Sequence, residues 1–254
     1  MNKFNDTAEI DAAHQTLITP AWHAPKGVEL RLSSRLHGQS VGQYGALNLG
    51  LHVGDVPETV LNNRARVAQE LPAEPVWLDQ VHGDYVFEVD ASVLSRQLRQ
   101  PTVADGSFTQ QTGVVLAIMV ADCLPVVLAS CDGKEIAVVH AGWRGLANGI
   151  LERAVTKFSS TELQAWLGPA IGPCHYEVDQ KVRGAFPDRK GFVKGRDSHH
   201  WVMDLCEQAG TQLLSLGVAS IEASGICTAC DDRFYSHRQT APTGRFGIFL
   251  WKTG

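Results

Sequence analysis

The longest apolar runs lie in the middle of the chain, and they predict β-strands that are buried on both faces. Residues 113–120 (GVVLAIMV) and 136–139 (IAVV) are uninterrupted and rich in β-branched side chains. Such runs are typical of strands in the interior of a sheet, because both faces of the strand contact other apolar side chains. Residues 126–129 (VVLA), which follow Pro125, indicate a returning strand between them.

The rest of the chain mixes further strands with helices. Apolar positions recur with the 3.6-residue period of an amphipathic helix in residues 59–71, 146–158 and 203–216. Shorter runs predict strands at residues 28–33, 76–78, 85–89, 165–171 and 245–251. Because strands and helices do not alternate regularly, the pattern predicts an α+β fold with mixed β-sheets flanked by helices.

No internal repeat, low-complexity tract or linker divides the sequence. We therefore expect residues 1–16 to form a loosely ordered N-terminal extension and residues 17–254 to form a single domain. A chain of 254 residues buries enough apolar surface to fold without metals or disulfides. A bound metal is therefore expected to serve function rather than folding.

The charge pattern excludes several classes of partner. The 22 basic and 27 acidic side chains give a formal charge of −5 and form no basic stripe, so we expect no nucleic-acid partner. No run approaches the ~18 apolar residues of a membrane span, and we expect no membrane partner. The first twenty residues lack the apolar core of a signal peptide, which predicts a cytoplasmic protein whose six cysteines are thiols. We also expect a monomer.

Two residues at the ends of predicted strands are candidate metal ligands. Cys123 and His140 each follow a buried apolar run, where a rigid backbone presents side chains to the loops. A catalytic zinc ion typically has three protein ligands drawn from His, Cys and carboxylates, and His82 would complete such a set. The three residues match no compact zinc-finger spacing. The spacing alone therefore leaves open whether they bind a metal or are packed side chains.

Two short motifs have both a functional and a structural interpretation. The segment GWRG at residues 142–145 joins a strand to a helix, and Arg144 beside a helix start suits an anion such as phosphate. The alternative is a tight turn with Arg144 in a salt bridge. Cys227 and Cys230 have CxxC spacing, but neither a second ligand pair nor a thioredoxin-like context is visible, so we interpret them as two ordinary thiols.

A series of short sequence motifs, spread in a fixed order over nearly the whole chain, resembles the motifs of one protein family. They are LITPAW, SSR, LNLGLHVGD, DQVHG, ADG, ADCLPV, HAGWRGL, WLGPAIGPCHYEV, ICT and FYSHR. With these phrases the chain resembles the YfiH/YlmD-type (laccase-domain) family. The resemblance implies a YfiH-like, cysteine-hydrolase-like fold and one zinc ion on His82, Cys123 and His140. One departure is His37, where the family more often has a glycine that allows special backbone angles.

The resemblance also implies an activity. Relatives are described as zinc-dependent purine nucleoside phosphorylases that act on adenosine, inosine and methylthioadenosine with phosphate, and as adenosine deaminases. A nucleoside and phosphate are therefore the expected partners. Phosphorolysis needs an anion site, and deamination needs an acid or base that moves protons. The candidate residues are Asp122 for proton transfer, Arg144, Arg64 and Arg238 for the anion, and Asn48 for the base or ribose.

Two alternatives remain. The family has also been described as a copper-dependent polyphenol oxidase, and a His₂Cys set can bind copper. None of the ten histidines forms the His-x-His pairs that such oxidases carry, which disfavours this reading. The second alternative is a hydrolase with Cys123 as nucleophile and His140 as base, including an amidase that edits peptidoglycan precursors. It uses the same residues, so the sequence does not separate it from the zinc enzyme.

Overall fold

The computed structural model describes residues 16–90, 92, 100–187, 190–218 and 220–253. Residues 1–15 of the expected N-terminal extension lie outside the described residues. Thr16, the last residue of that expected extension, is buried, and its backbone N–H donates to the Glu70 carboxylate at 3.0 Å. Thr16 is therefore held against the rest of the described structure, and the expectation for residues 1–15 stays a prediction.

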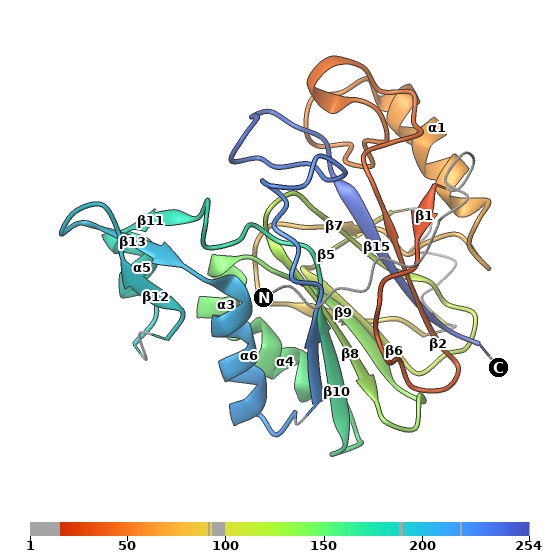
Figure 1. Ribbon diagram of the computed structural model, residues 1–254. Helices are drawn as coiled ribbons and strands as arrows, with labels where there is room; N and C mark the ends of the chain where they lie inside the picture. The colour runs from red at the N-terminus through yellow and green to blue at the C-terminus, as the bar shows by residue number, and fades with distance from the viewer. Residues whose placement is uncertain (1–15, 91, 93–99, 188–189, 219, 254) are drawn as a thin grey trace.

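Two β-sheets form the centre of the protein (Figure 1). One has the order β1 (Leu17–Ile18), β2 (Val28–Ser33), β15 (Phe246–Lys252) and β7 (Leu116–Val120). The other has the order β14 (Ser220–Ala223), β10 (Leu163–Leu167), β8 (Leu124–Ser130), β9 (Ile136–Ala141), β6 (Gly106–Thr109) and β4 (Val86–Glu88). The pairs β10–β14 and β4–β6 are parallel and the others antiparallel, which confirms the predicted mixed sheets.

The uninterrupted apolar run of β8 is explained by what lies on its two faces. Val126 and Leu128 belong to a core that includes apolar residues of the flanking helices. Val127 and Ala129 belong to a second core, which packs the two sheets against each other. Successive side chains of a strand point to opposite faces, so a strand between two cores is apolar at every position.

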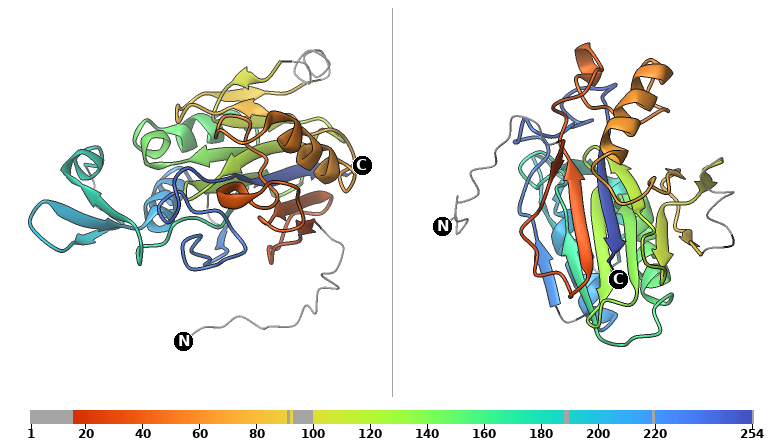
Figure 2. Two further views of the ribbon diagram at one scale, coloured as in Figure 1. Left: turned by 90° about the horizontal axis from the view of Figure 1, so that it is seen from above. Right: turned by 90° about the vertical axis from the view of Figure 1, so that its right-hand side faces the viewer.

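Helices cover the outer faces of both sheets, which gives the layer order α/β/β/α (Figure 2). The helices α3 (Trp143–Ala147), α4 (Ile150–Val155) and α6 (Leu205–Ser215) pack on the six-stranded sheet, and α1 (Pro57–Ala68) packs on the four-stranded sheet. The prediction of a single helix over residues 146–158 is wrong. The segment forms two helices, α3 and α4, which are separated at Gly149, because its left-handed φ of 85° interrupts helical geometry.

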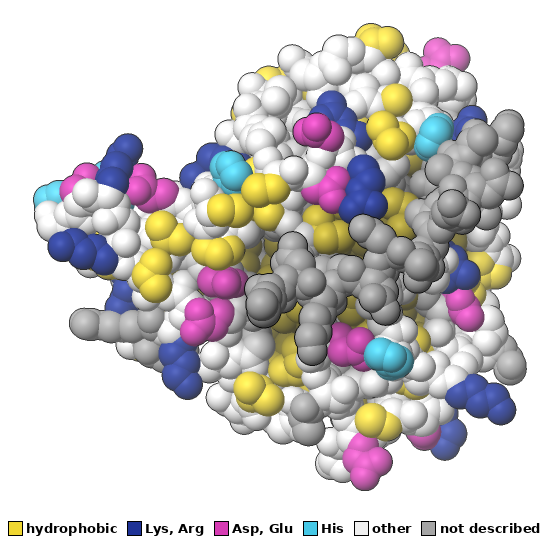
Figure 3. Space-filling view, viewed as in Figure 1, with side chains coloured by type: hydrophobic (Ala, Val, Ile, Leu, Met, Phe, Trp, Pro, Cys, Tyr) yellow, Lys and Arg dark blue, Asp and Glu magenta, His cyan; other side chains and the backbone are white. Residues whose placement is uncertain are grey.

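A small sheet projects from this body, and we call it the arm (Figures 1 and 3). It consists of β11 (Glu177–Asp179), α5 (Gln180–Gly184), β12 (Phe192–Lys194) and β13 (His200–Met203), in the strand order β11–β13–β12. The sequence indicated only a solvated loop around His199 and His200, because short strands that are mostly only partly buried carry little apolar periodicity. His200 in fact begins β13.

Three further short elements lie among the described residues: a 3₁₀ helix, η1 (Gly42–Tyr44), and the parallel pair β3 (Leu78–Asp79) and β5 (Thr102–Val103). The α+β fold with mixed sheets and flanking helices is as predicted. Among the described residues, no helix has the length and apolar character needed to cross a membrane.

Candidate metal centre

A cavity of about 560 Å³ opens where the chain passes from the four-stranded to the six-stranded sheet. It is lined by His52, Gln80, His82, Met119, Val120, Ala121, Asp122, Cys123, His140, Arg144, Ile171, Tyr176, His237, Arg238 and Arg245. The three predicted metal ligands and three further predicted site residues, Asp122, Arg144 and Arg238, are therefore brought together here.

The β8–β9 hairpin places Cys123 beside His140. Cys123 directly precedes β8, and the first residues of that strand, Leu124 and Pro125, lie opposite Ala141 and His140 in the antiparallel register. The sequence separation of the two candidate ligands is therefore the length of a hairpin. His140 lies within β9 and not just after it, because the strand extends to Ala141 instead of ending at Val139 as predicted.

His82 is held in place by a buried carboxylate that the sequence did not assign. His82 lies in the loop after β3 and has a left-handed φ of 61°. Asp105 accepts hydrogen bonds from the backbone N–H groups of Val81, His82 and Gly83 at 3.1, 2.9 and 2.6 Å. Its Oδ1 also lies 2.8 Å from Nδ1 of His140. Asp105 therefore orients two of the three candidate ligands.

The geometry of the three side chains suits a metal ion. The ligand atoms of His82, Cys123 and His140 lie within 4.8 Å of one another, and the two imidazole rings are inclined by 68°. Hydrogen bonding of Nδ1 of His140 to Asp105 leaves Nε2 for the metal, which is the usual arrangement of a ligating histidine. Two imidazoles and one thiolate match the three-ligand sets of catalytic sites that keep one position open.

Gly142 leaves the space that the ligands occupy. A Cβ atom at this position would lie 2.8 Å from Sγ of Cys123 and 3.6 Å from Cδ2 of His82. The φ of Gly142 is −66°, which any residue adopts, so the glycine is required by space and not by backbone conformation. The sequence contained this signal in the phrase HAGWRG, but only the fold shows what the glycine faces.

Electrostatics favours a thiolate at Cys123. Burial alone would raise the pKa of the thiol, but His140 and His82 outweigh it and lower that pKa to about 6. Burial alone would lower the pKa of His140, whereas the Cys123 charge and the Asp105 hydrogen bond raise it to about 9. Without a metal the site therefore holds a thiolate–imidazolium pair, and the thiolate is the form that binds metals.

Arg144 is available to an anion. Its guanidinium lies over the Trp143 ring at 4.8 Å and lines the cavity. Within the described part of the chain Arg144 makes no ion pair, so the alternative of a structural salt bridge is not observed. A cation without an acidic partner at a cavity wall is suited to bind phosphate.

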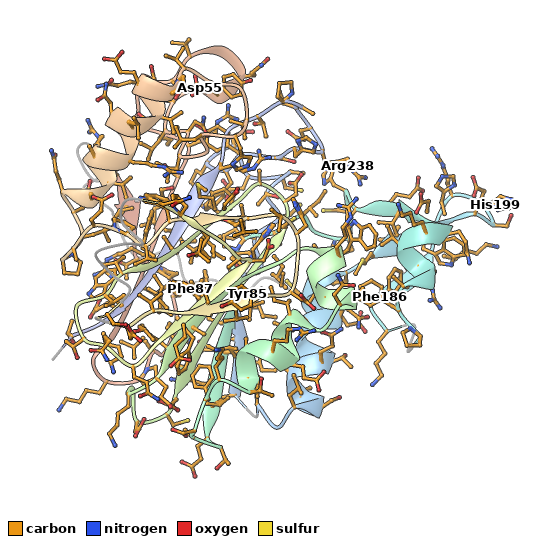
Figure 4. All side chains as sticks on the ribbon, turned by 180° about the vertical axis from the view of Figure 1, so that it is seen from behind. Asp55, Tyr85, Phe87, Phe186, His199 and Arg238 are labelled. Atoms are coloured by element: carbon orange, nitrogen blue, oxygen red, sulfur yellow. The ribbon has the colours of Figure 1, made fainter. Side chains whose placement is uncertain are left out.

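Two further arginines line the same cavity. Arg238 donates from Nη1 to the backbone oxygens of His175 and Glu177, both at 3.1 Å, and lies at the base of the arm (Figure 4). Arg245 donates to the backbone oxygens of Thr243 and Gly244, both at 3.0 Å. Arg245 was not predicted as a site residue, because nothing next to it in the sequence marks it as part of a site.

Asp122 anchors loops around the cavity. It has a left-handed φ of 87° in the turn between β7 and β8. Its Oδ1 accepts from the Thr228 hydroxyl and its Oδ2 from the Arg238 backbone N–H, both at 2.7 Å. Because each oxygen already accepts a hydrogen bond, a positioning role fits the geometry, and the proton-transfer role expected of Asp122 stays a prediction.

The structure does not bring Asn48 and Arg64 to the cavity wall. Asn48 is fully buried, and its side chain bonds to Gly50, Asp55 and the backbone N–H of Arg245. Arg64 donates to the Leu49 carbonyl at 2.9 Å and lies over the Trp77 ring at 4.1 Å. Both side chains make hydrogen bonds inside the protein, and the substrate-binding roles expected of Asn48 and Arg64 stay predictions.

His37, the departure from the family pattern, has a left-handed φ of 65°. This is the region that glycine adopts without cost and other residues adopt rarely. The histidine therefore keeps the backbone angle that a glycine would supply. It does not line the cavity, so the substitution leaves the described wall unchanged.

Comparisons with known proteins agree with this geometry. A family model described as multi-copper polyphenol oxidoreductase laccase matches residues 29–253. The purine nucleoside phosphorylase YfiH of Escherichia coli (strain K12) is 41% identical over 245 residues, which cover 92% of this chain and 98% of that protein. A purine nucleoside phosphorylase of Pseudomonas aeruginosa is 42% identical over 242 residues, covering 92% and 97%.

Solved structures show the same fold. A Neisseria meningitidis protein superposes with a TM-score of 0.87 at 36% identity and covers 94% of this chain and 100% of its own. YlmD of Geobacillus stearothermophilus superposes with a TM-score of 0.85 at 30% identity, covering 94% and 97%.

The substitution Gly142→Ala tests the space around the ligands. The added Cβ lies too close to Sγ of Cys123, so we expect metal binding to weaken roughly tenfold or more. The measurement is the affinity for added Zn²⁺ by competition with a chelator. Gly210→Ala is the matched control, because its Cβ would meet nothing within 4 Å. Equal affinity in the two variants would contradict the assignment.

The substitution Asp105→Asn tests the carboxylate. The amide keeps the volume but replaces one accepting oxygen with a donor, so we expect the Kd for Zn²⁺ to rise roughly 10- to 100-fold. The free energy of unfolding is expected to fall by about 1–3 kcal/mol. Asp84→Asn, which alters only a surface ion pair with Arg153, should leave metal affinity unchanged. An unaltered Kd in Asp105→Asn would show that Asp105 does not orient the ligands.

Proposed function

The chain belongs to the YfiH/YlmD-type family, whose model is described as multi-copper polyphenol oxidoreductase laccase, and we propose that it is a zinc-dependent purine nucleoside phosphorylase. It converts adenosine, inosine or methylthioadenosine and phosphate into the free base and the sugar 1-phosphate. The observation that carries the proposal is one cavity that joins a His₂Cys centre to three arginines. The names of the relatives support the same activity. We also propose that the enzyme is monomeric and cytoplasmic.

The arginines are proposed to bind phosphate. Arg144 supplies an unpaired guanidinium, while Arg238 and Arg245 are fixed by backbone carbonyls and add positive charge to the same wall. An oxygen of the phosphate attacks the anomeric carbon of the ribose as the bond to the purine breaks. Fixed cations at the phosphate hold the nucleophile in position, and orientation of this kind lowers the barrier.

The remaining wall suits a purine nucleoside. Met119, Val120, Ile171 and Tyr176 supply apolar and aromatic surface against which a base can lie. The leaving purine takes up a proton, and we propose the exposed imidazole of His237 as its donor, because it lies on the cavity wall and an imidazole is the most common proton donor at such sites. Asp122 is proposed to position His237, because it accepts a hydrogen bond from the backbone N–H of Arg238, the residue after His237.

Adenosine deamination is proposed as a second reaction in the same cavity. A zinc ion bound by His82, Cys123 and His140 would act as a Lewis acid, which lowers the pKa of a water molecule that it binds. The three side chains are unequally buried, with His140 buried and His82 exposed, so the centre faces the cavity from one side. This arrangement leaves room for a substrate beside the ligands.

The polyphenol oxidase alternative has weaker support. The His₂Cys set suits copper as well as zinc. A multicopper enzyme needs several such centres, however, and the described residues gather only one further group of metal-binding side chains, with three thiols and one imidazole. We propose that any copper-dependent oxidation is a side reaction.

The hydrolase alternative is favoured by one observation. The thiolate–imidazolium pair of Cys123 and His140 resembles an activated nucleophile and its base. It would serve an amidase, including one that edits peptidoglycan precursors. His82 distinguishes the two functions, since a metal centre needs a third ligand and a Cys–His nucleophile does not.

In the decisive experiment the zinc-loaded protein is incubated with adenosine and phosphate, and the products are measured over time. We expect adenine and ribose 1-phosphate from phosphorolysis and inosine from deamination. Cys123→Ala and His82→Ala are expected to abolish all three products, whereas Cys131→Ala, an exposed thiol outside the cavity, should keep them. No product from the wild type would refute the proposal. Full activity of the metal-free enzyme and of His82→Ala on an amide would favour the hydrolase.

A second experiment tests the anion site. Removing one charge-assisted contact costs about 1.5–3 kcal/mol, so we expect Arg144→Ala to raise the KM for phosphate roughly 10- to 150-fold. The KM for the nucleoside should change less. Arg153→Ala, which removes an arginine of a surface ion pair outside the cavity, is the control. An unchanged KM for phosphate in Arg144→Ala would show that Arg144 does not bind phosphate.

A further inference from the structure

A second group of metal-binding side chains lies outside the catalytic cavity. Sγ of Cys174 is 3.5 Å from Sγ of Cys227 and 3.6 Å from Sγ of Cys230. Nδ1 of His175 lies 3.2, 3.9 and 3.4 Å from the sulfurs of Cys174, Cys227 and Cys230. The two ordinary thiols of the CxxC motif therefore meet a second ligand pair, which the sequence did not reveal.

Backbone pairing builds this group. Ala170 and Cys227 form a parallel bridge, and the N–H of Thr228 donates to the Ala170 carbonyl at 2.9 Å. The segment after β10 and the segment after β14 are thus aligned by the main chain, as extensions of the parallel pair β10–β14. The four side chains are brought together by the fold, and not by chance contact of long flexible groups.

The distances match one ion with four ligands. In a tetrahedral site with metal–sulfur bonds of about 2.3 Å, the sulfurs lie about 3.8 Å apart and a nitrogen lies about 3.5 Å from each. The observed nitrogen–sulfur distances of 3.2–3.9 Å surround the second value, and the sulfur–sulfur distances of 3.5 and 3.6 Å lie slightly below the first. A disulfide needs a sulfur–sulfur bond of about 2.05 Å, and Cys174 is nearly equidistant from two partners, so the geometry selects neither pair.

The surroundings favour a thiolate cluster. The backbone N–H of Gly172 donates to Sγ of Cys227 at 3.1 Å, a bond that stabilises a metal-bound thiolate. A Cβ at Gly172 would lie 3.3 Å from Sγ of Cys227 and 3.4 Å from Sγ of Cys174, so the glycine leaves the sulfurs room.

We propose that Cys174, His175, Cys227 and Cys230 bind a second metal ion, a zinc ion with a structural role. Thiol-rich sets select zinc among the common divalent ions. Four protein ligands close the coordination sphere, which is typical of structural zinc and differs from the three-ligand catalytic set. The proposal does not depend on the proposed catalytic activity.

The position of this second site explains its role. Thr228, inside the CxxC motif, donates to Asp122 at 2.7 Å, and the His175 carbonyl accepts from Arg238 at 3.1 Å. Both Asp122 and Arg238 line the catalytic cavity, and Arg238 lies at the base of the arm (Figure 4). The ion therefore cross-links two loops that support one wall of that cavity.

The test is the zinc content of the purified protein after loading with Zn²⁺ and removal of free metal, measured by mass spectrometry. We expect two ions per chain in the wild type, one in Cys230→Ser, one in Cys123→Ala and none in the double variant. Cys131→Ser, an exposed thiol outside both groups, should keep two. One ion in the wild type, unchanged in Cys230→Ser, would overturn the proposal. So would an intact mass lower by two hydrogens, which reveals a disulfide.

Cobalt gives an independent readout that requires no second folded variant. In Cys123→Ala the proposed site is the one of the two metal-binding groups that still contains cysteines. Bound Co²⁺ should therefore show intense sulfur-to-cobalt charge-transfer absorption from this site. Absence of that absorption would overturn the proposal even if Cys230→Ser failed to fold. A protein that binds two zinc ions but does not cleave nucleosides would refute the proposed function and leave the second site standing.

Discussion

The hydrogen bonds of the buried Asp105 carboxylate are the interactions on which the candidate metal centre depends. Asp105 is 0% exposed, and a buried charge is tolerated only when hydrogen bonds replace its hydration. Burial alone would raise the pKa of this carboxyl, but the hydrogen bonds from His140, Gly83 and Val81 lower it, so Asp105 is a carboxylate. One charge therefore fixes a loop backbone and an imidazole together. The strained left-handed conformation of His82 persists because this carboxylate holds its N–H.

The rest of the centre follows from where the two sheets meet. The chain leaves one sheet at Val120 and enters the other at Leu124, so the turn between them lies at the seam of the two layers. Cys123 lies in this turn, and the β8–β9 register brings His140 beside it. Layers packed on both sides make the ligand positions rigid, which a metal site requires, while the seam itself remains open as the cavity.

The sequence predicted those parts of the fold and site that depend on local pattern. The buried strands were visible because strands between two apolar cores have no polar positions, and Cys123 and His140 were visible because they stand at strand ends. The buried position of Asn48 could not be predicted, because a buried, hydrogen-bonded amide and a substrate ligand look the same in sequence. Asp105 was missed because its partners are loop N–H groups, which any residue carries.

One group of cysteine and histidine side chains could be predicted from the sequence and the other could not, and the reason is the way the backbone brings each group together. A hairpin relates Cys123 to His140, whereas Cys174 meets the CxxC motif through parallel pairing of segments that are remote in the chain. Parallel neighbours need a long connection, so no sequence spacing reports their contact. The two groups are nevertheless close in structure. Thr228 bonds to Asp122, and Asp122 directly precedes Cys123. The group formed by Cys174, His175, Cys227 and Cys230 is therefore linked through one hydrogen bond to the turn that carries Cys123.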